Sequence, residues 1–283
     1  MSDLKGSKVS NLMQSALIKN VEELKAEGIE PGLAVILVGD DPASQVYVGH
    51  KEKAAGKLGI RSEKITYPND VTQEELLEKI EELNQDETID GILVQLPLPE
   101  HINENLVIRT IDPAKDVDCF HPENVGKLFL GSNGLLPCTP NGIMHLLKAY
   151  DIPIAGKNVV IIGRSNIVGK PLAHLFLKEN ATVTITHSQT KHLNYYTRNA
   201  DILVAAIGKP KFVTSYMVKK GAVVIDVGIN RVGEKLYGDV DYDSVSKLAS
   251  YITPVPGGIG PMTITMLMYN TIKASRMRRK HED

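Results

Sequence analysis

The chain has 283 residues, of which 42% are hydrophobic and 23% charged, a composition typical of folded globular proteins rather than disordered ones. The 32 Lys and Arg residues nearly balance the 34 Asp and Glu residues, so no strong positive field favours nucleic-acid binding. No apolar run is long enough to cross a membrane. The two cysteines, Cys119 and Cys138, are too few for a disulfide framework or a four-cysteine zinc site, and we expect a reducing, cytoplasmic setting.

Short apolar runs alternate with amphipathic segments along most of the chain. Strands that are buried on both faces have such runs, and this burial is typical of parallel sheets. Residues 9–26 carry apolar residues at helical spacing, and residues 72–85 open with Thr72 and Glu75, the pattern of a capping box. The alternation predicts an α/β protein. The expected strands are 33–38, 92–96, 159–162, 183–186, 202–206 and 223–227.

The length predicts about two domains at roughly 150 residues each. One domain boundary is expected in the Gly- and Pro-rich segment 131–140. At the end of this segment, Thr139 would cap a helix that begins at Pro140. The last helical segment, 261–279, could return to the first domain. The prediction is therefore a first domain of residues 1–138 plus 262–283 and a second domain of residues 139–261.

The strand at 159–162 leads into a glycine turn and then a helix, the arrangement that binds a phosphate at a helix N-terminus. Ser165 stands where the G-x-G-x-x-G pattern has its second glycine, so a tight turn without a ligand is the alternative. The next strand ends in His187 and Ser188 and lacks the acid that binds the ribose of NAD. Arg164 and Ser188 could bind a 2′-phosphate instead, which favours NADP, although Ser188 could also cap a helix over 190–199.

A second group of polar residues follows strands of the first half. Asp41 and Pro42 predict the start of a helix that carries Ser44, Tyr47 and Lys51 on one face. This helix lies after the carboxyl end of a strand, where α/β sheets place ligands, and the alternative is a solvated amphipathic helix.

Further polar residues lie late in the apolar run 92–96 and after it. Gln95 sits near the end of that run, before the two prolines that stop it, and needs a hydrogen-bond partner if it is buried. Of Asp116 and Asp118, one is expected to cap a helix and the other to accept hydrogen bonds from a ligand. The histidines show no metal-binding spacing, so no metal is predicted.

Seven segments, in collinear order over nearly the whole chain, resemble the bifunctional methylenetetrahydrofolate dehydrogenase/methenyltetrahydrofolate cyclohydrolase family. The segments are ILVGDDPASQVYVGHKEKAA (from Ile36), GILVQLPLP (from Gly91), KDVDCFHPENVGKL (from Lys115), PCTPNGI (from Pro137), VVIIGRSNIVGKPLA (from Val159), DVGIN (from Asp226) and TPVPGGIGPMTITMLMYNT (from Thr253).

The resemblance implies a multifunctional oxidoreductase and hydrolase of tetrahydrofolate one-carbon metabolism, which serves purine biosynthesis. It would oxidise 5,10-methylenetetrahydrofolate to 5,10-methenyltetrahydrofolate with NADP and hydrolyse the product to 10-formyltetrahydrofolate. The implied fold is two α/β domains, the second a Rossmann-like doubly wound parallel sheet, with a folate cleft between them, and the implied assembly is a homodimer. The alternatives are a single-activity NAD(P)-dependent methylenetetrahydrofolate dehydrogenase that lacks effective cyclohydrolase activity and a non-catalytic nucleotide-binding or scaffold protein.

The resemblance also implies roles for individual residues. Lys51 would be the key catalytic group, with Gln95 as its hydrogen-bond partner, and Tyr47 would stack on the folate while Asp118 holds the pterin. Because hydride transfer creates positive charge on the substrate, our own hypothesis is that Lys51 is neutral in that step. In this sequence Cys119 replaces a usual glycine, and Gly49 and His50 replace a more polar pair. The implied NADP contacts are Gly163, Arg164, Ser165, Ser188 and Ile229, and the implied folate contacts are Ser44, Tyr47, Gln95, Leu96, Asp118, Pro256, Gly257 and Gly258.

Overall fold

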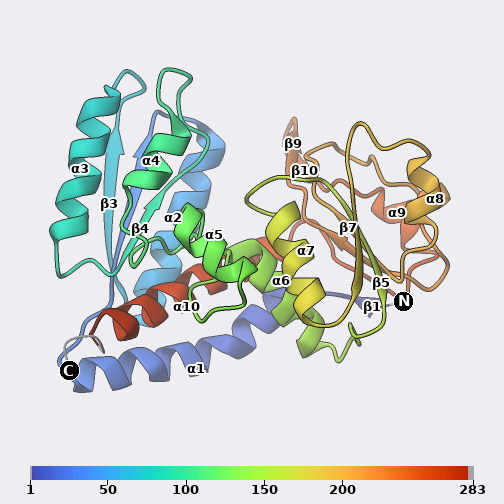
Figure 1. Ribbon diagram of the computed structural model, residues 1–283, viewed down its shortest axis with the longest axis horizontal. Coiled ribbons are helices and arrows are strands. Elements are labelled where there is room, and N and C mark those ends of the chain that lie inside the picture. The colour runs from blue at the N-terminus through green and yellow to red at the C-terminus, as the bar shows by residue number, and fades with distance from the viewer. Residues whose placement is uncertain (1, 280–283) are drawn as a thin grey trace. The chain divides into compact units, whose positions relative to one another are not determined.

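The computed structural model describes residues 2–279, which form two compact α/β units, each with its own parallel sheet (Figure 1). The three-stranded unit contains residues 12–138 and 264–279, and the six-stranded unit contains residues 2–11 and 139–263. This division differs from the expected domains at the N-terminus, where residues 2–11 belong to the six-stranded unit, and at the second boundary, where residues 262–263 also belong to it. The first strand, β1 (Ser2–Asp3), pairs with β11 (Tyr251–Ile252) of the six-stranded sheet, and Leu4 N donates to Ile252 O at 2.8 Å.

In the three-stranded unit, β2 is the central strand of the order β3-β2-β4, and all seven of its residues are buried. Alternate residues of a strand point to opposite faces, so β2 contributes to two separate cores. Leu33 packs in a core with residues of α1, α2 and α10, whereas Ile36 packs in a core with residues of α3 and α4. The elements with residues in this unit are α1 (Gly6–Ala26), β2 (Gly32–Val38), α2 (Pro42–Leu58), β3 (Arg61–Tyr67), α3 (Gln73–Gln85), β4 (Gly91–Val94), α4 (Glu104–Thr110), α5 (Pro122–Phe129) and α10 (Ile259–Arg279).

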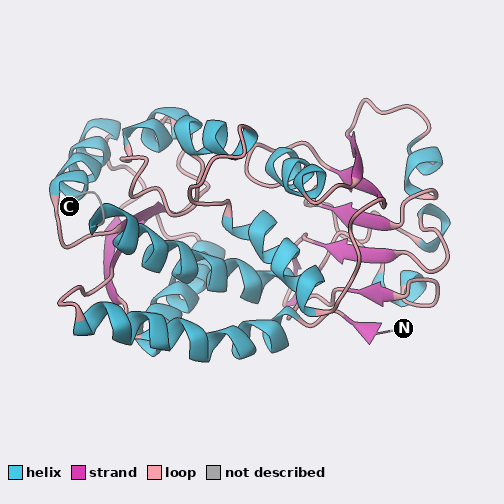
Figure 2. Cartoon of the chain, turned by 60° about the horizontal axis from the view of Figure 1, so that its bottom comes forward, coloured by secondary structure: helices cyan, strands magenta, loops and turns pink. Residues whose placement is uncertain are grey.

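In the six-stranded unit, the sheet order β1-β11-β8-β7-β5-β6 is parallel throughout, and Figure 2 shows its strands side by side in magenta. The chain passes from β5 to β6 on one side and then to β7 on the other, so the strand order reverses between β5 and β7. Ligands bind at such a switch point in doubly wound sheets. The elements with residues in this unit, besides the first residues of α1 and α10, are β1 (Ser2–Asp3), α6 (Cys138–Ala149), β5 (Asn158–Ile162), α7 (Gly169–Lys178), β6 (Thr182–Thr186), α8 (Leu193–Thr197), β7 (Ile202–Ala205), η1 (Ser215–Met217), β8 (Val223–Asp226), β9 (Asn230–Val232), β10 (Lys235–Tyr237), α9 (Tyr242–Val245) and β11 (Tyr251–Ile252).

The structure confirms the two-unit parallel α/β architecture and the capping box, in which Glu75 N donates to Thr72 Oγ1 and Thr72 N donates to Glu75 Oε2. Two expected helix starts are wrong. The helix expected from Pro140 begins at Cys138, and α8 begins at Leu193 after His192, so Ser188 is not its N-cap. None of the helices within residues 2–279 is long and apolar enough to span a bilayer.

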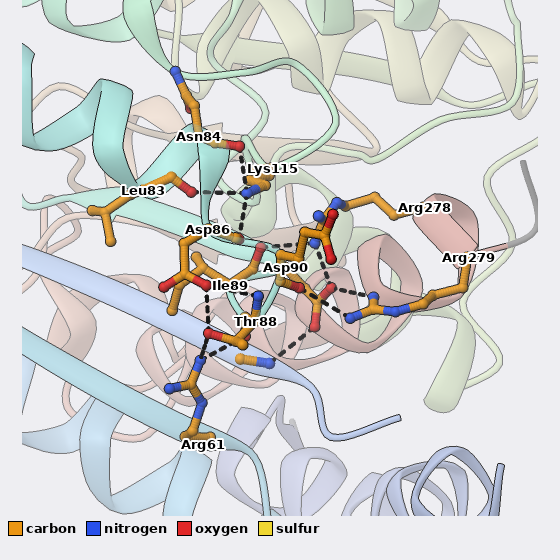
Figure 3. Close-up of polar contacts among 12 residues, drawn as sticks. Arg61, Leu83, Asn84, Asp86, Thr88, Ile89, Asp90, Lys115, Arg278 and Arg279 are labelled. Carbon is orange, nitrogen blue, oxygen red and sulfur yellow. Dashed lines mark hydrogen bonds and ion pairs between the residues drawn. The ribbon is translucent and has the colours of Figure 1, made fainter. Parts of the chain in front are cut away.

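A buried lysine fixes the segment that follows α4. Lys115 is 1% exposed, and its ammonium donates to the carbonyl oxygens of Leu83, Asn84 and Asp86 at 2.7–2.8 Å, at the end of α3 (Figure 3). Its own carbonyl oxygen accepts from Ile92 N of β4 at 2.8 Å. Burial lowers the pKa of Lys115 to about 8, an effect to which the nearby guanidinium of Arg278 adds. The residues after Lys115 are therefore anchored to both α3 and β4.

Beside Lys115, the buried carboxylate of Asp90 ties the last turn of α10 to the start of β2 (Figure 3). It accepts from Arg278 and Arg279 at 2.7 Å each and from Gly32 N at 3.0 Å. A buried carboxylate is costly unless it is paired, and here two guanidinium groups offset that cost.

We expect Lys115→Met to lower the free energy of unfolding by about 3 kcal/mol, because three carbonyl oxygens lose their donor in a dry site. Lys79→Met, which removes an ion pair between the half-buried Lys79 and the exposed Glu82 of α3, should cost less than about 1 kcal/mol. Denaturant unfolding of the two variants measures the difference. Equal stability of Lys115→Met and the unsubstituted protein would contradict the anchoring role.

Candidate active site

Lys51 and Gln95 meet at the carboxyl ends of β2 and β4. The helix α2 starts where predicted, with the Asp41 carboxylate accepting from Ser44 N at 2.7 Å and Pro42 in the first turn. Gln95 N donates to Ile36 O at 2.9 Å, which fixes the residue at the end of the sheet. The Lys51 ammonium donates to Gln95 Oε1 at 2.9 Å.

The amide of Gln95 is oriented by a second bond. Gln95 Nε2 donates to Leu96 O at 2.7 Å, so its oxygen faces the ammonium of Lys51. Lys51, Gln95 and Tyr47 are all half-buried. Half-burial leaves part of each side chain accessible to a substrate.

Asp118 lies beside this pair. A parallel bridge pairs Ile92 of β4 with Asp116, two residues before Asp118, and the charge of Lys51 acts on the Asp118 carboxyl group. Burial raises the pKa of Asp118 to about 6, although the nearby positive charge of Lys51 and a hydrogen bond from the Cys138 thiol both lower it. An ammonium, an amide and a carboxyl group are thereby gathered at one place.

The two acids of this segment divide their roles. Asp116 is 2% exposed, and its carboxylate accepts from His121 N at 2.8 Å, from Asn124 Nδ2 at 2.9 Å and from Phe120 N at 3.3 Å. It therefore holds the turn that leads into α5, but the expected helix cap is wrong, because His121 is the N-cap of α5. Asp118 is half-buried and lies beside Lys51.

Cys119 follows Asp118 with a φ of 62°, in the left-handed region that favours glycine, which accounts for the glycine usual at this position. The side chain is buried in the core of the three-stranded unit, where its thiol donates to Leu135 O at 3.2 Å. Burial also raises the pKa of this thiol. The cysteine thus packs inward.

The glycine turn after β5 lies at the switch point of the six-stranded sheet. Gly163 has a φ of 127°, and a Cβ there would overlap the carbonyl oxygen of Ala206, so no side chain fits. Ser165 Oγ accepts from Val168 N and Gly169 N at 3.2 Å each, at the start of α7. The serine that departs from the glycine pattern therefore fixes the turn that leads into α7, and the cradle without a Cβ fits a dinucleotide.

The other residues predicted to bind the cofactor follow neighbouring strands. Ile162 of β5 pairs with Thr186 of β6, so the exposed Arg164 and Ser188 both follow the same edge of the sheet. Ile229 follows β8 and is 41% exposed.

Of the predicted folate contacts, Ser44 and Leu96 lie in the three-stranded unit, where Ser44 is buried in the first turn of α2 and Leu96 is half-buried beside Gln95. Pro256, Gly257 and Gly258 follow β11 in the six-stranded unit, and Gly257 O accepts from Ser7 N at 3.1 Å.

The sequence reasoning missed two features of these sites. One is the Cys138 thiol, which lies near Asp118 and donates to Val117 O at 3.3 Å, although Cys138 lies in one of the segments that carried the resemblance. The other is a hollow of about 630 Å³ at β6, whose lining includes His187, Thr190 and Lys191. Within residues 2–279, no three His, Cys, Asp or Glu side chains are grouped so that they could hold a metal ion.

Fold and sites together define an α/β enzyme with a dinucleotide-binding sheet and a separate lysine-containing site. Two family models match the chain: the catalytic domain of tetrahydrofolate dehydrogenase/cyclohydrolase over residues 4–118 and its NAD(P)-binding domain over residues 137–279. The chain belongs to the tetrahydrofolate dehydrogenase/cyclohydrolase family.

Similar proteins agree with this assignment. The "Bifunctional protein FolD" of Anoxybacillus flavithermus is 57% identical over 278 residues, which are 98% of each chain. The crystal structure of the bifunctional FolD enzyme of Campylobacter jejuni has a TM-score of 0.96 at 52% identity and covers 98% of this chain and 99% of its own. The Trypanosoma brucei enzyme, solved with NADP and an inhibitor, has a TM-score of 0.94 at 40% identity. The match covers 98% of this chain and 97% of that enzyme's chain.

Proposed function

We propose that the protein oxidises 5,10-methylenetetrahydrofolate to 5,10-methenyltetrahydrofolate with NADP and hydrolyses the product to 10-formyltetrahydrofolate. The observation that carries the proposal is the hydrogen bond from Lys51 to Gln95 beside the carboxyl group of Asp118. The family membership supports both activities. A single-activity dehydrogenase has no observation in its favour, because the lysine and its amide partner are both present.

Asp118 binds the pterin in this proposal. Its carboxylate can accept two N–H bonds from the aminopyrimidinone of the pterin, and such charge-assisted pairs align the reacting carbon. Tyr47, on the same face of α2 as Lys51, offers an aromatic ring to the aminobenzoyl group.

Lys51 moves the proton in the hydrolytic step. Water must lose a proton as it attacks the methenyl carbon, and a lysine held by a neutral amide is placed to accept that proton. Hydride departure creates positive charge on the folate, and only the unprotonated amine of Lys51 can take a proton from the water that then attacks. NADP, when bound, accepts the hydride, and Gly163, Arg164, Ser165, Ser188 and Ile229 would hold it.

Two assays test this function. With methylenetetrahydrofolate and NADP, the purified protein should form NADPH, and with methenyltetrahydrofolate alone it should form 10-formyltetrahydrofolate faster than the buffer does. NADPH formation without accelerated hydrolysis would support the single-activity alternative. Absence of both reactions in a protein that binds NADPH would support a non-catalytic role.

The cofactor preference should depend on Arg164. We expect kcat/KM to be higher with NADP than with NAD, and we expect Arg164→Gln to reduce that ratio by about tenfold, the value of one charge-assisted bond to a phosphate. Lys178→Gln, at the exposed end of the same βα segment, should leave the ratio unchanged. A clear preference for NAD in the unsubstituted protein would contradict the role of Arg164 and Ser188.

We also propose that the protein is a cytoplasmic homodimer. The two cysteines are buried and unpaired, which fits a reducing compartment. The strand β6 is an edge strand of the six-stranded sheet, and edge strands are common sites of pairing between chains. Light scattering of the purified protein measures the assembly, and a monomer would contradict the proposal.

A further inference from the structure

A buried carboxylate, Asp239, holds the loop that follows β7. Asp239 is completely buried and accepts from three successive backbone N–H groups, those of Ile207 at 2.7 Å, Gly208 at 3.0 Å and Lys209 at 2.8 Å. A fourth donor is Asn230 Nδ2 at 3.0 Å. With four donors, the carboxylate is satisfied in the interior without a positive partner.

A second carboxylate, Asp226, fixes Asp239 itself. Asp226 is the last residue of β8 and is 3% exposed. It accepts from Asp239 N at 2.8 Å, from Val240 N at 2.9 Å and from Gly228 N at 3.1 Å. The approach is so close at Gly228 that a Cβ there would overlap the Asp239 carboxylate. The two acids therefore form one brace behind the ends of β7 and β8.

The loops that this brace holds are those next to the dinucleotide site. Ala206, directly before the braced residues 207–209, presents the carbonyl oxygen that packs against Gly163 at the switch point. Ile229 lies between Gly228 and Asn230, each of which donates to a carboxylate of the brace. The residue after Ala206 and the residues on both sides of Ile229 are thus held by the two acids.

We propose that Asp239, held by Asp226, is a positioning residue for the dinucleotide: it places the loop 207–209 and Ile229 where the cofactor binds. The inference rests on the proposed function, which supplies the cofactor, and no role in the chemistry is assigned to either acid. Because the N–H groups of residues 207–209 are committed to Asp239, the conformation of this loop depends on a charged acceptor and not on the cofactor.

Asp239→Asn tests the proposal, because the amide keeps the shape but loses the ability to accept on one side. We expect the KM for NADP and the Kd for NADPH to rise about tenfold, as for the loss of hydrogen bonds to a charged group, while the rate of methenyl hydrolysis and the KM for folate change less than about twofold. The chain has no Trp, so NADPH fluorescence reports binding without a tryptophan background. An unchanged NADPH Kd in the folded variant would overturn the proposal.

A second variant, Asn230→Ala, keeps the proposal testable if Asp239→Asn does not fold. Asn230→Ala removes only the side-chain donor, at a half-exposed position, and should raise the NADPH Kd about threefold, whereas an unchanged Kd would overturn the proposal.

Asp116→Asn is the matched control, since Asp116 is also a buried carboxylate with three N–H donors but belongs to the folate-binding unit of the proposal. It should raise the KM for folate and leave the NADPH Kd unchanged. If Asp116→Asn and Asp239→Asn weakened both ligands alike, the effect would be general destabilisation and the positioning role would be wrong. The proposed function is tested separately: it is wrong if the unsubstituted protein lacks both activities. In that case the NADPH titration still tests the brace, because it measures cofactor binding and not turnover.

Discussion

Replacement of Lys51 by glutamine should reduce the hydrolysis of methenyltetrahydrofolate by about 10²–10⁴-fold, the range expected when a general base is lost. Glutamine is one atom shorter than lysine and keeps an N–H donor, but it cannot accept the proton from the attacking water. Hydride transfer needs no proton transfer, so NADPH formation should fall much less. Separate assays of the two reactions on one preparation measure this split.

Lys53→Gln is the matched control, because it makes the same change on α2 at an exposed position. Both activities should stay within about twofold of the unsubstituted protein, as for most surface substitutions. Retention of full cyclohydrolase activity by Lys51→Gln would remove Lys51 from the mechanism.

Asp118→Asn should have the second-largest effect and should impair both reactions. Hydrogen bonds to a charged group are worth about 1.5–3 kcal/mol, so kcat/KM for the folate should fall by roughly 10–150-fold whichever reaction is assayed. Glu123→Gln, on the exposed face of α5, should change neither reaction. An Asp118→Asn variant that kept its folate KM would show that another group binds the pterin.

The same carboxyl group sets a pH dependence. Its pKa is raised to about 6 by burial, so the acceptor form is lost as the pH falls through that value, and folate affinity should fall with it. The free energy of unfolding responds to pH in the opposite direction. Because the pKa of Asp118 is higher in the folded protein, its contribution to stability is fully present below the ordinary value of 3.8 and is lost as the pH rises through about 6. The pH profile of folate KM should show this inflection in the unsubstituted protein and lack it in Asp118→Asn.

The parts of this fold that the sequence predicted correctly depend on short-range signals. The start of α2 at Asp41–Pro42 and the capping box at Thr72 involve groups three residues apart, so their geometry is contained in the local sequence. The buried parallel strands were predictable because they are apolar on both faces. The strand β3, with the sequence RSEKITY, was missed because its residues are only half-buried or exposed and its pattern is polar.

The parts that the sequence could not show depend on distant partners. Asp116 and Asp118 are two residues apart, and which one is structural depends on Asn124 and the turn before α5. Asp239 looks like an ordinary loop acid until its donors, at residues 207–209, are brought to it from about 30 positions away. Lys115 likewise has its three acceptors on α3 and just after it, which no local pattern indicates.

The product balance of the coupled reaction tests the central claim, that Lys51 carries the second step and not the first. The protein is given methylenetetrahydrofolate and NADP, and methenyltetrahydrofolate and 10-formyltetrahydrofolate are both quantified against the NADPH formed. The account predicts that the unsubstituted protein yields 10-formyltetrahydrofolate as the main product, whereas Lys51→Gln accumulates methenyltetrahydrofolate in proportion to NADPH. A Lys51→Gln protein that still delivers 10-formyltetrahydrofolate at the rate of NADPH formation would contradict it.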